Sequence, residues 1–96
     1  MRVWLDDVRP MPEGFDLHVM DAVAAIAALR TGKVTFMSFD HDLGKDETGY
    51  TVAKWIEEEA QAGRIPRLFW QIHSANPVGQ KNMEAALTNA DKFWGA

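Results

Sequence analysis

The chain has 96 residues and carries 10 basic against 14 acidic side chains, for a formal net charge of −4. This length predicts a single domain over residues 1–96, and the acidic balance argues against duplex DNA as a partner. The absence of cysteine excludes disulfides and thiolate chemistry, and no apolar run reaches the ~18–20 residues of a membrane helix. Because the N-terminus has no signal-peptide pattern, we expect a cytoplasmic protein without a membrane partner.

Short apolar runs alternate with helical patterns along the chain, which is typical of an α/β protein with a parallel sheet. Four strands are predicted, at residues 2–5, 17–20, 34–39 and 67–72. Three helices are predicted: one over residues 22–31 behind an Asp21 cap, one over residues 49–62, and one that begins at Pro77 behind an Asn76 cap. We therefore expect a small four-stranded parallel sheet with helices on both faces.

The segment over residues 8–15 holds two prolines and a glycine, so it is predicted to be a loop. As a link between two parallel strands it is short, because such crossovers usually need a dozen residues or more. This link is the least usual feature of the predicted fold.

Apolar spacing also predicts which side chains form the core. The stripes expected on the three helices are Val23, Ile26 and Ala27; Val52, Ile56 and Ala60; and Met83, Leu87, Ala90 and Trp94. The strand aromatic residues expected in the core are Phe36, Phe39, Phe69 and Trp70. Phe93 and Trp94, near the C-terminus, can instead form an exposed apolar interface through which the chain forms an oligomer.

Polar side chains follow three of the four predicted strands. They are Asp6-Asp7, Asp40-His41-Asp42 and His73-Ser74. In open parallel sheets, ligands bind outside the carboxyl ends of the strands. If the first, third and fourth strands are neighbours, the clusters form a row roughly 10 Å long, since adjacent strands lie about 4.8 Å apart. Such a row has room for one small anionic ligand and a metal ion.

Four carboxylates, from Asp6, Asp7, Asp40 and Asp42, would repel one another in a shared site. Like charges this close raise a pKa or recruit a cation, and carboxylate oxygens suit Mg²⁺ or Mn²⁺. The alternative is that these residues only cap the turns that follow the strands, as Asp often does.

Two histidines, His41 and His73, accompany the carboxylates. Imidazoles on neighbouring strand ends can serve as acid and base in phosphodiester hydrolysis near neutral pH. The alternative is a packed histidine that hydrogen bonds to backbone. For His41 this alternative gains weight, because alternation along a strand points it away from Asp40.

The start of the third predicted helix is the best candidate for holding a phosphate. Ser74, Asn76 and Gly79 join a strand end to a helix N-terminus, which offers free N–H groups and the positive end of the helix dipole. Asn76 can contact the ligand, cap the helix, or do both. Arg9 and Lys81 supply positive charge, although Arg9 can simply pair with a carboxylate and Lys81 can be a solvated surface charge.

Four motifs, in this order, resemble one family. They are LDDVRP at residues 5–10, SFDHDLG at residues 38–44, GYTV and Trp55-Ile56 within residues 49–56, and HSANPVG and Asn82-Met83 within residues 73–83. The family is the cyclic-phosphate-processing receiver-like domain of small bacterial and phage proteins, and the resemblance covers nearly the whole chain. It implies a small receiver-like (flavodoxin-like) α/β fold, an acidic pocket, and the processing of cyclic phosphates on nucleotides or RNA ends.

The same resemblance implies roles for individual residues. Asp6 and Asp7 match the acidic pair that binds Mg²⁺ in receiver domains. Asp40, with Asp42 as a rival, matches the aspartate that accepts phosphate. Ser74 matches the Ser or Thr that ends the fourth strand.

Departures from the receiver pattern bear on the activity. No fifth strand with its lysine is found in these 96 residues, and no clear first helix precedes the second strand. His41 and His73 are additions that a signalling receiver does not need. These differences favour hydrolysis over phosphorelay.

Metal-assisted hydrolysis of a cyclic phosphate is therefore the first functional hypothesis. Asp6 or Asp7, together with Asp40, would hold Mg²⁺ or Mn²⁺, which would polarise the phosphoryl oxygens or activate water. His73 would protonate the leaving ribose oxygen, and His41 or Asp42 would take a proton from water. In a metal-free variant the two histidines act as acid and base, and insensitivity to EDTA would distinguish it.

Two other hypotheses stay open. The chain can be a binding module that captures a cyclic nucleotide or a phosphorylated ligand without turnover, or a degenerate receiver that accepts phosphate on Asp40. For the enzyme, the expected partner is a small cyclic-phosphate nucleotide or an RNA end.

Overall fold

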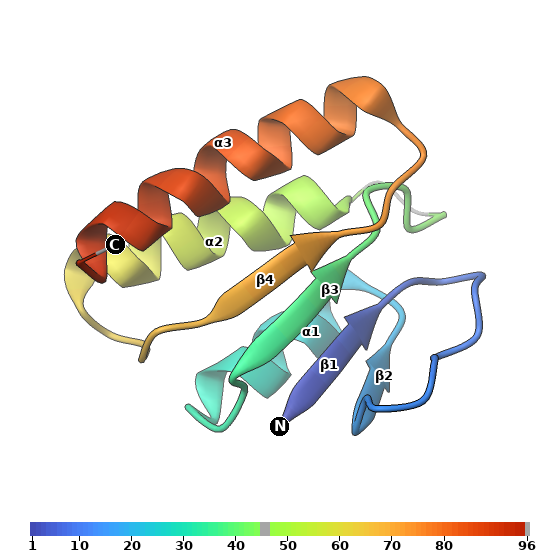
Figure 1. Ribbon diagram of the computed structural model, residues 1–96, viewed down its shortest axis with the longest axis horizontal. Helices are drawn as coiled ribbons and strands as arrows, with labels where there is room; N and C mark the ends of the chain where they lie inside the picture. The colour runs from blue at the N-terminus through green and yellow to red at the C-terminus, as the bar shows by residue number, and fades with distance from the viewer. Residues whose placement is uncertain (45–46, 96) are drawn as a thin grey trace.

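The computed structural model describes residues 1–44 and 47–95. Its strands are β1 (Arg2–Leu5), β2 (Leu17–Val19), β3 (Phe36–Phe39) and β4 (Phe69–Ile72), and its helices are α1 (Ala22–Arg30), α2 (Gly49–Ala62) and α3 (Pro77–Phe93). The strands form one sheet in the order β2-β1-β3-β4, and every neighbouring pair is parallel (Figure 1). The predicted fold class is confirmed, with β3 and β4 each beginning two residues later than predicted.

The short connection from β1 to β2 does join parallel neighbours. Trp4 pairs with His18 in the ladder between these strands. The loop returns to the start of β1, where the Asp16 carboxylate accepts a hydrogen bond from the Arg2 N–H at 2.8 Å. Nearer the start of the loop, the Arg9 carbonyl accepts a hydrogen bond from the Trp4 indole at 3.2 Å, which ties the loop to β1. The loop therefore makes the crossover without a helix.

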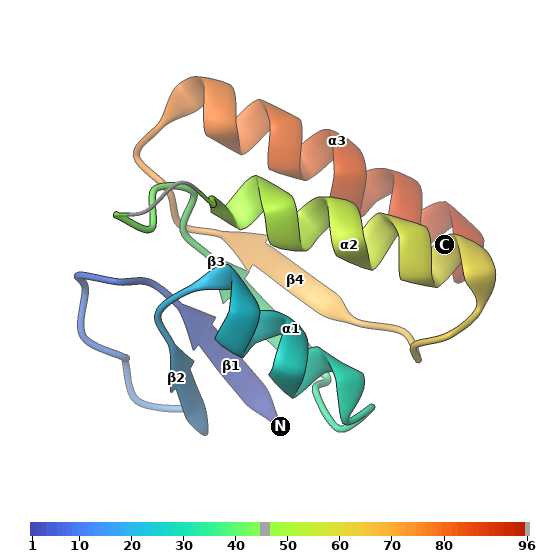
Figure 2. The same cartoon turned by 180° about the vertical axis from the view of Figure 1, so that it is seen from behind.

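The helices pack on one face of the sheet, so the expectation of helices on both faces is wrong for the described residues (Figure 2). The reason lies in strand order. The crossovers through α1 (β2 to β3) and α2 (β3 to β4) run in the same direction across the sheet, and right-handed crossovers in one direction place their helices on the same face. α3 packs along α2 and beside β4 (Figures 1 and 2).

The core lies between this face and the helices. Val3, Leu5, Met37 and Phe39 are fully buried there. The predicted stripe of α2 and the first three members of the α3 stripe are confirmed as buried. Trp94 is partly buried and its indole donates to the Ile65 carbonyl at 3.3 Å, whereas the neighbouring Phe93 is exposed.

The predicted stripe of α1 is wrong. Val23 is 71% exposed, and the buried positions of this helix are Ala22, Ala25, Ala28 and Leu29. Asp21 caps the helix as predicted, accepting a hydrogen bond from the Ala24 N–H at 2.8 Å. Alanines let a helix lie close to the core, and this close approach decides the rotation of α1.

The other face of the sheet carries the alternate side chains. Its members on the three longer strands are Arg2, Trp4, Phe36, Ser38, Phe69 and Gln71. Phe15 of the β1–β2 loop packs edge-on against Trp4, which is buried. Phe69, in contrast, is 59% exposed and Phe36 is only partly buried, so the prediction that both are core residues is wrong.

Candidate functional site

The predicted row of polar clusters forms where β1, β3 and β4 end side by side. The ladder continues one residue past each strand, because the Asp40 N–H donates to the Leu5 carbonyl and the His73 N–H to the Phe39 carbonyl, both at 2.9 Å. Strand alternation then directs Asp6, Asp40 and His73 toward the helix-free face. Three residues distant in sequence therefore share one edge of the sheet.

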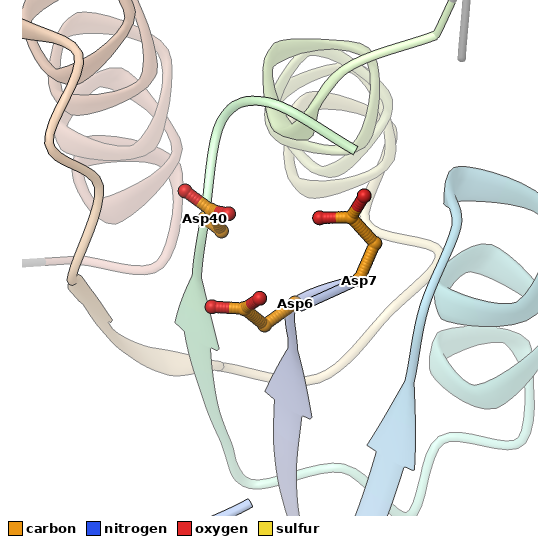
Figure 3. Close-up of side chains that lie close together, drawn as sticks. All are labelled: Asp6, Asp7 and Asp40. Carbon is orange, nitrogen blue, oxygen red and sulfur yellow. The ribbon is translucent and has the colours of Figure 1, made fainter. Parts of the chain in front are cut away.

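Three carboxylates converge at this edge. Oxygen atoms of Asp6, Asp7 and Asp40 lie within 4.8 Å of one another (Figure 3). Gly44 makes room for Asp7: a Cβ at this glycine would lie 2.7 Å from Asp7 Oδ2, and its φ of 69° also disfavours a side chain. Two ligands on opposite sides of a Mg²⁺ ion lie about 4.2 Å apart, at ~2.1 Å each. The three oxygens are thus close to the spacing of a shared coordination shell.

Asp6 is fully buried yet stabilised as a carboxylate. Its Oδ1 accepts hydrogen bonds from the N–H groups of Val8 at 2.8 Å and Arg9 at 2.7 Å. Its Oδ2 lies 3.0 Å from Nε2 of His73. Burial alone would raise the pKa of Asp6, but the hydrogen bonds from Arg9, Val8 and His73 together lower it below its usual value.

Asp40 has the opposite shift. Burial raises its pKa above the usual value, the hydrogen bond from the His41 N–H lowers it in part, and the nearby Asp6 charge raises it again. The Arg9 guanidinium lies 3.7 Å from Asp40 and 3.4 Å from Asp6, so it only partly compensates the two charges. A second cation would stabilise this pair of carboxylates further.

The carboxylates border an open cavity of about 390 Å³. Its lining consists of Asp6, Asp7, Val8, Arg9, Asp40, Asp42, Gly44 and Ala75. The cavity thus has an acidic floor and a guanidinium beside it, and it is large enough for a phosphate group with a metal ion.

His73 sits next to the carboxylates in a hydrogen-bonded chain. Gln71 Nε2 donates to Ser38 Oγ at 2.9 Å, Ser38 Oγ lies 2.7 Å from His73 Nδ1, and His73 Nε2 lies 3.0 Å from Asp6 Oδ2. The indole of Trp4 stacks on the imidazole, with ring centres 3.9 Å apart. Burial lowers the pKa of His73, although the adjacent Asp6 opposes this shift. A neutral His73 therefore donates from Nε2 to Asp6 and accepts from the Ser38 hydroxyl at Nδ1.

Ser38 and Gln71 of this hydrogen-bonded chain, and Trp4, which stacks on His73, were not predicted as site residues. Each lies two positions before a polar residue at a strand end, on the same face of its strand. The signal was present in the alternation of each strand. It could be used only with the pairing of the strands, which places Ser38 between Trp4 and Gln71.

The comparisons with known proteins agree with this geometry. The chain matches the cyclic-phosphate processing receiver domain over residues 1–89. It belongs to this family. The match includes all four motifs and the three carboxylates, and it confirms the family resemblance seen in the sequence. No curated protein and no solved structure gives a significant match.

His41 lies on the other side of the strand ends of this receiver domain, toward the helices. Its ring packs on Gly79, where an added Cβ would overlap the imidazole. Its Nδ1 lies 2.9 Å from Asp42 Oδ1, and this hydrogen bond lowers the pKa of the exposed Asp42. The structure therefore pairs His41 with Asp42 and His73 with Asp6, and it does not pair the two histidines with each other.

The start of α3 has mainly local partners in this receiver domain. Asn76 Oδ1 accepts from the Gly79 N–H at 2.9 Å, which is the capping role. Ser74 is buried, its Oγ accepts from the Asn76 N–H at 3.0 Å, and its carbonyl accepts from the Gln80 side chain. Gly79 accommodates His41 rather than a ligand. The segment reaches the cavity through Ala75.

Lys81 lies apart from the carboxylates. It lines a second hollow, between α2 and α3, together with Tyr50, Lys54 and Lys92 among others. Of the two predicted cationic contacts, the structure therefore brings Arg9 to the cavity and turns Lys81 elsewhere. Across residues 1–44 and 47–95, the helices lack the combination of length and apolarity that crossing a membrane requires.

Proposed function

We propose that this receiver domain hydrolyses a cyclic phosphate on a nucleotide or an RNA end, with Mg²⁺ or Mn²⁺ held by Asp6, Asp7 and Asp40. The convergence of these three carboxylates in an open cavity is the observation that carries the proposal. An all-oxygen donor set of this kind suits a hard divalent cation. When bound, the metal supplies a Lewis acid for the phosphoryl oxygens and for water.

The residues around the carboxylates have separate proposed roles. Arg9 binds the phosphate, because its guanidinium borders the cavity and its contacts to the carboxylates are long, at 3.4 and 3.7 Å. Its Nη1 also donates to the His73 carbonyl at 3.2 Å, which holds the guanidinium at this edge. Asp42, backed by His41, takes the proton from the attacking water, since it lines the same cavity and most of its side chain is exposed. The water oxygen then bonds to phosphorus while the ring P–O bond breaks, and the leaving ribose oxygen takes up a proton from solvent water in the open cavity.

His73 is assigned a positioning role in place of the proton-donor role expected from the sequence. Both of its ring nitrogens already have partners, and Trp4 covers one face of the ring. Its hydrogen bond orients the Asp6 carboxylate, as outer partners of metal ligands do.

The test is ³¹P NMR of nucleoside 2′,3′- and 3′,5′-cyclic phosphates and of a cyclic-phosphate-ended RNA, each with Mg²⁺, Mn²⁺ or EDTA. We expect metal-dependent ring opening that Asp7→Asn reduces at least ~100-fold, because even outer partners of metal ligands contribute 10–100-fold. Asp7 is preferred to Asp6 for this variant, since Asp6 also holds the loop through the N–H groups of Val8 and Arg9.

Glu84→Gln is the matched control, because Glu84 is an exposed acid on α3 that lines the second hollow. Ring opening that persists in EDTA would refute the role of the metal. Shifted or broadened substrate signals without product would instead identify a binding module. A stable acyl phosphate on Asp40 after addition of a phosphodonor would identify a phospho-acceptor receiver.

A further inference from the structure

The helix-free face of the sheet leads directly to the carboxylates. Strand pairing arranges it in three successive rows: Arg2, Phe36 and Phe69; then Trp4, Ser38 and Gln71; then Asp6, Asp40 and His73. This face is turned toward the viewer in Figure 1 and ends at the edge shown in Figure 3. Trp4 and Ser38 of the middle row are buried, so the accessible path to this edge runs along β4, where Phe69 and Gln71 are exposed and His73 is partly exposed.

The first row combines the exposed ring of Phe69 and the partly buried ring of Phe36 with nearby arginines. Phe69 is 59% exposed, and the Arg67 guanidinium lies 5.0 Å from the centre of its ring. The Arg2 guanidinium lies 4.2 Å from the centre of the Phe36 ring. Within the described residues neither arginine forms an ion pair. Although the chain is acidic overall, this end of the face is positive and aromatic.

We propose that the β3–β4 half of this face binds the unpaired nucleotides that precede the cyclic phosphate of a single-stranded RNA end. The inference rests on the proposed function and narrows its substrate from mononucleotides to RNA. Bases stack on aromatic rings and on arginine planes, and phosphates complement the charge of Arg2 and Arg67.

The spacing of the rows suits this substrate. Phe36 and Asp40 are four residues apart on one strand, as are Phe69 and His73 on the next, which is about 13 Å at ~3.3 Å per residue. A few stacked nucleotides, at ~3.4 Å each, cover this length. Gln71, in the middle row, is exposed between Phe69 and His73, where it can contact a base.

Binding is tested separately from turnover, by fluorescence anisotropy of a labelled, unpaired RNA hexanucleotide that ends in a 3′-hydroxyl and cannot be hydrolysed at its end. We expect Phe69→Ala to weaken binding about tenfold, the scale of one lost base stack, and Phe69→Trp to bind at least as tightly as the parent protein. Phe93→Ala is the matched control, because Phe93 is exposed on α3 and should leave the affinity unchanged. Circular dichroism checks that each variant is folded.

Turnover provides the second arm. We expect the cyclic-phosphate-ended hexanucleotide to exceed the mononucleotide about tenfold in kcat/KM, and Phe69→Ala to bring this ratio toward one.

Equal affinity of Phe69→Ala and the parent protein for RNA, or a ratio of one in the parent protein, overturns the inference while leaving hydrolysis intact. RNA binding that depends on Phe69, with no ring opening of any substrate, supports the surface and refutes the hydrolase. Sedimentation that shows self-association lost in Phe69→Ala would assign the face to a second copy of the chain and overturn the inference.

Discussion

The two faces of the sheet differ in composition and in the role of their side chains. Val3, Leu5, Met37 and Phe39 face the helices and are fully buried. On the opposite face, side chains of β3 and β4 form a hydrogen-bonded chain that ends at a buried carboxylate. In this molecule burial on one face supplies stability, which leaves the other face able to hold polar and titratable groups in fixed positions.

The largest expected contrast between the faces is in stability. Phe39→Ala removes a fully buried ring and should lower the free energy of unfolding by about 3–5 kcal/mol. Phe69→Ala, on the open face, should change it by roughly 0.5 kcal/mol or less. Urea unfolding measures both, and similar losses would show that Phe69 is also part of the core.

A second contrast concerns the two histidines. Because the Gly79 Cβ would overlap the His41 ring, Gly79→Ala should destabilise the protein by about 1–3 kcal/mol, the cost of overpacking. The double variant Gly79→Ala with His41→Ala should recover much of this loss, since the added methyl group then has room. Additive effects of the two changes would show that the ring and the glycine are not in contact.

The hydrogen-bonded chain of the open face is tested at Ser38. Ser38→Ala leaves the buried His73 Nδ1 without its partner and should cost about 1–2 kcal/mol. Gln71→Ala is the control, because Gln71 is exposed and water can replace it, so its expected cost is below roughly 0.5 kcal/mol. Thermal unfolding of both variants measures the two losses of stability. An equal loss in both would show that the Ser38–His73 contact does not account for the loss in Ser38→Ala.

The smallest expected effect has the opposite sign. The pKa of Asp40 is raised in the fold, so its protonated form contributes stability that is present below its usual pKa of 3.8 and is lost as the pH rises through the folded value. At pH 7 in EDTA, Asp40→Asn should therefore stabilise the protein by about 1 kcal/mol. The gain should vanish near pH 3 and should shrink when Mg²⁺ is added to both proteins. A gain that does not depend on pH would contradict repulsion and burial as its cause.

Much of the site could be predicted from the sequence, because strand ends are local features. Asp6, Asp7 and Asp40 follow apolar runs, and in a parallel sheet such positions share one edge. The pairing of His41 with Gly79 could not be predicted in this way. It depends on how α3 approaches the end of β3, and the same packing separates His41 from His73.

The sequence by itself determined the elements, the parallel sheet and the acidic edge, since alternation, caps and turn residues act over a few neighbouring positions. Strand order decided the rest. It placed the helices on one face, which left Phe36 and Phe69 outside the core although both are apolar. It also put Ser38 between Trp4 and Gln71, and so built a chain of contacts from three strands. Such contacts join residues more than thirty positions apart, and only the tertiary structure brings them within hydrogen-bonding distance.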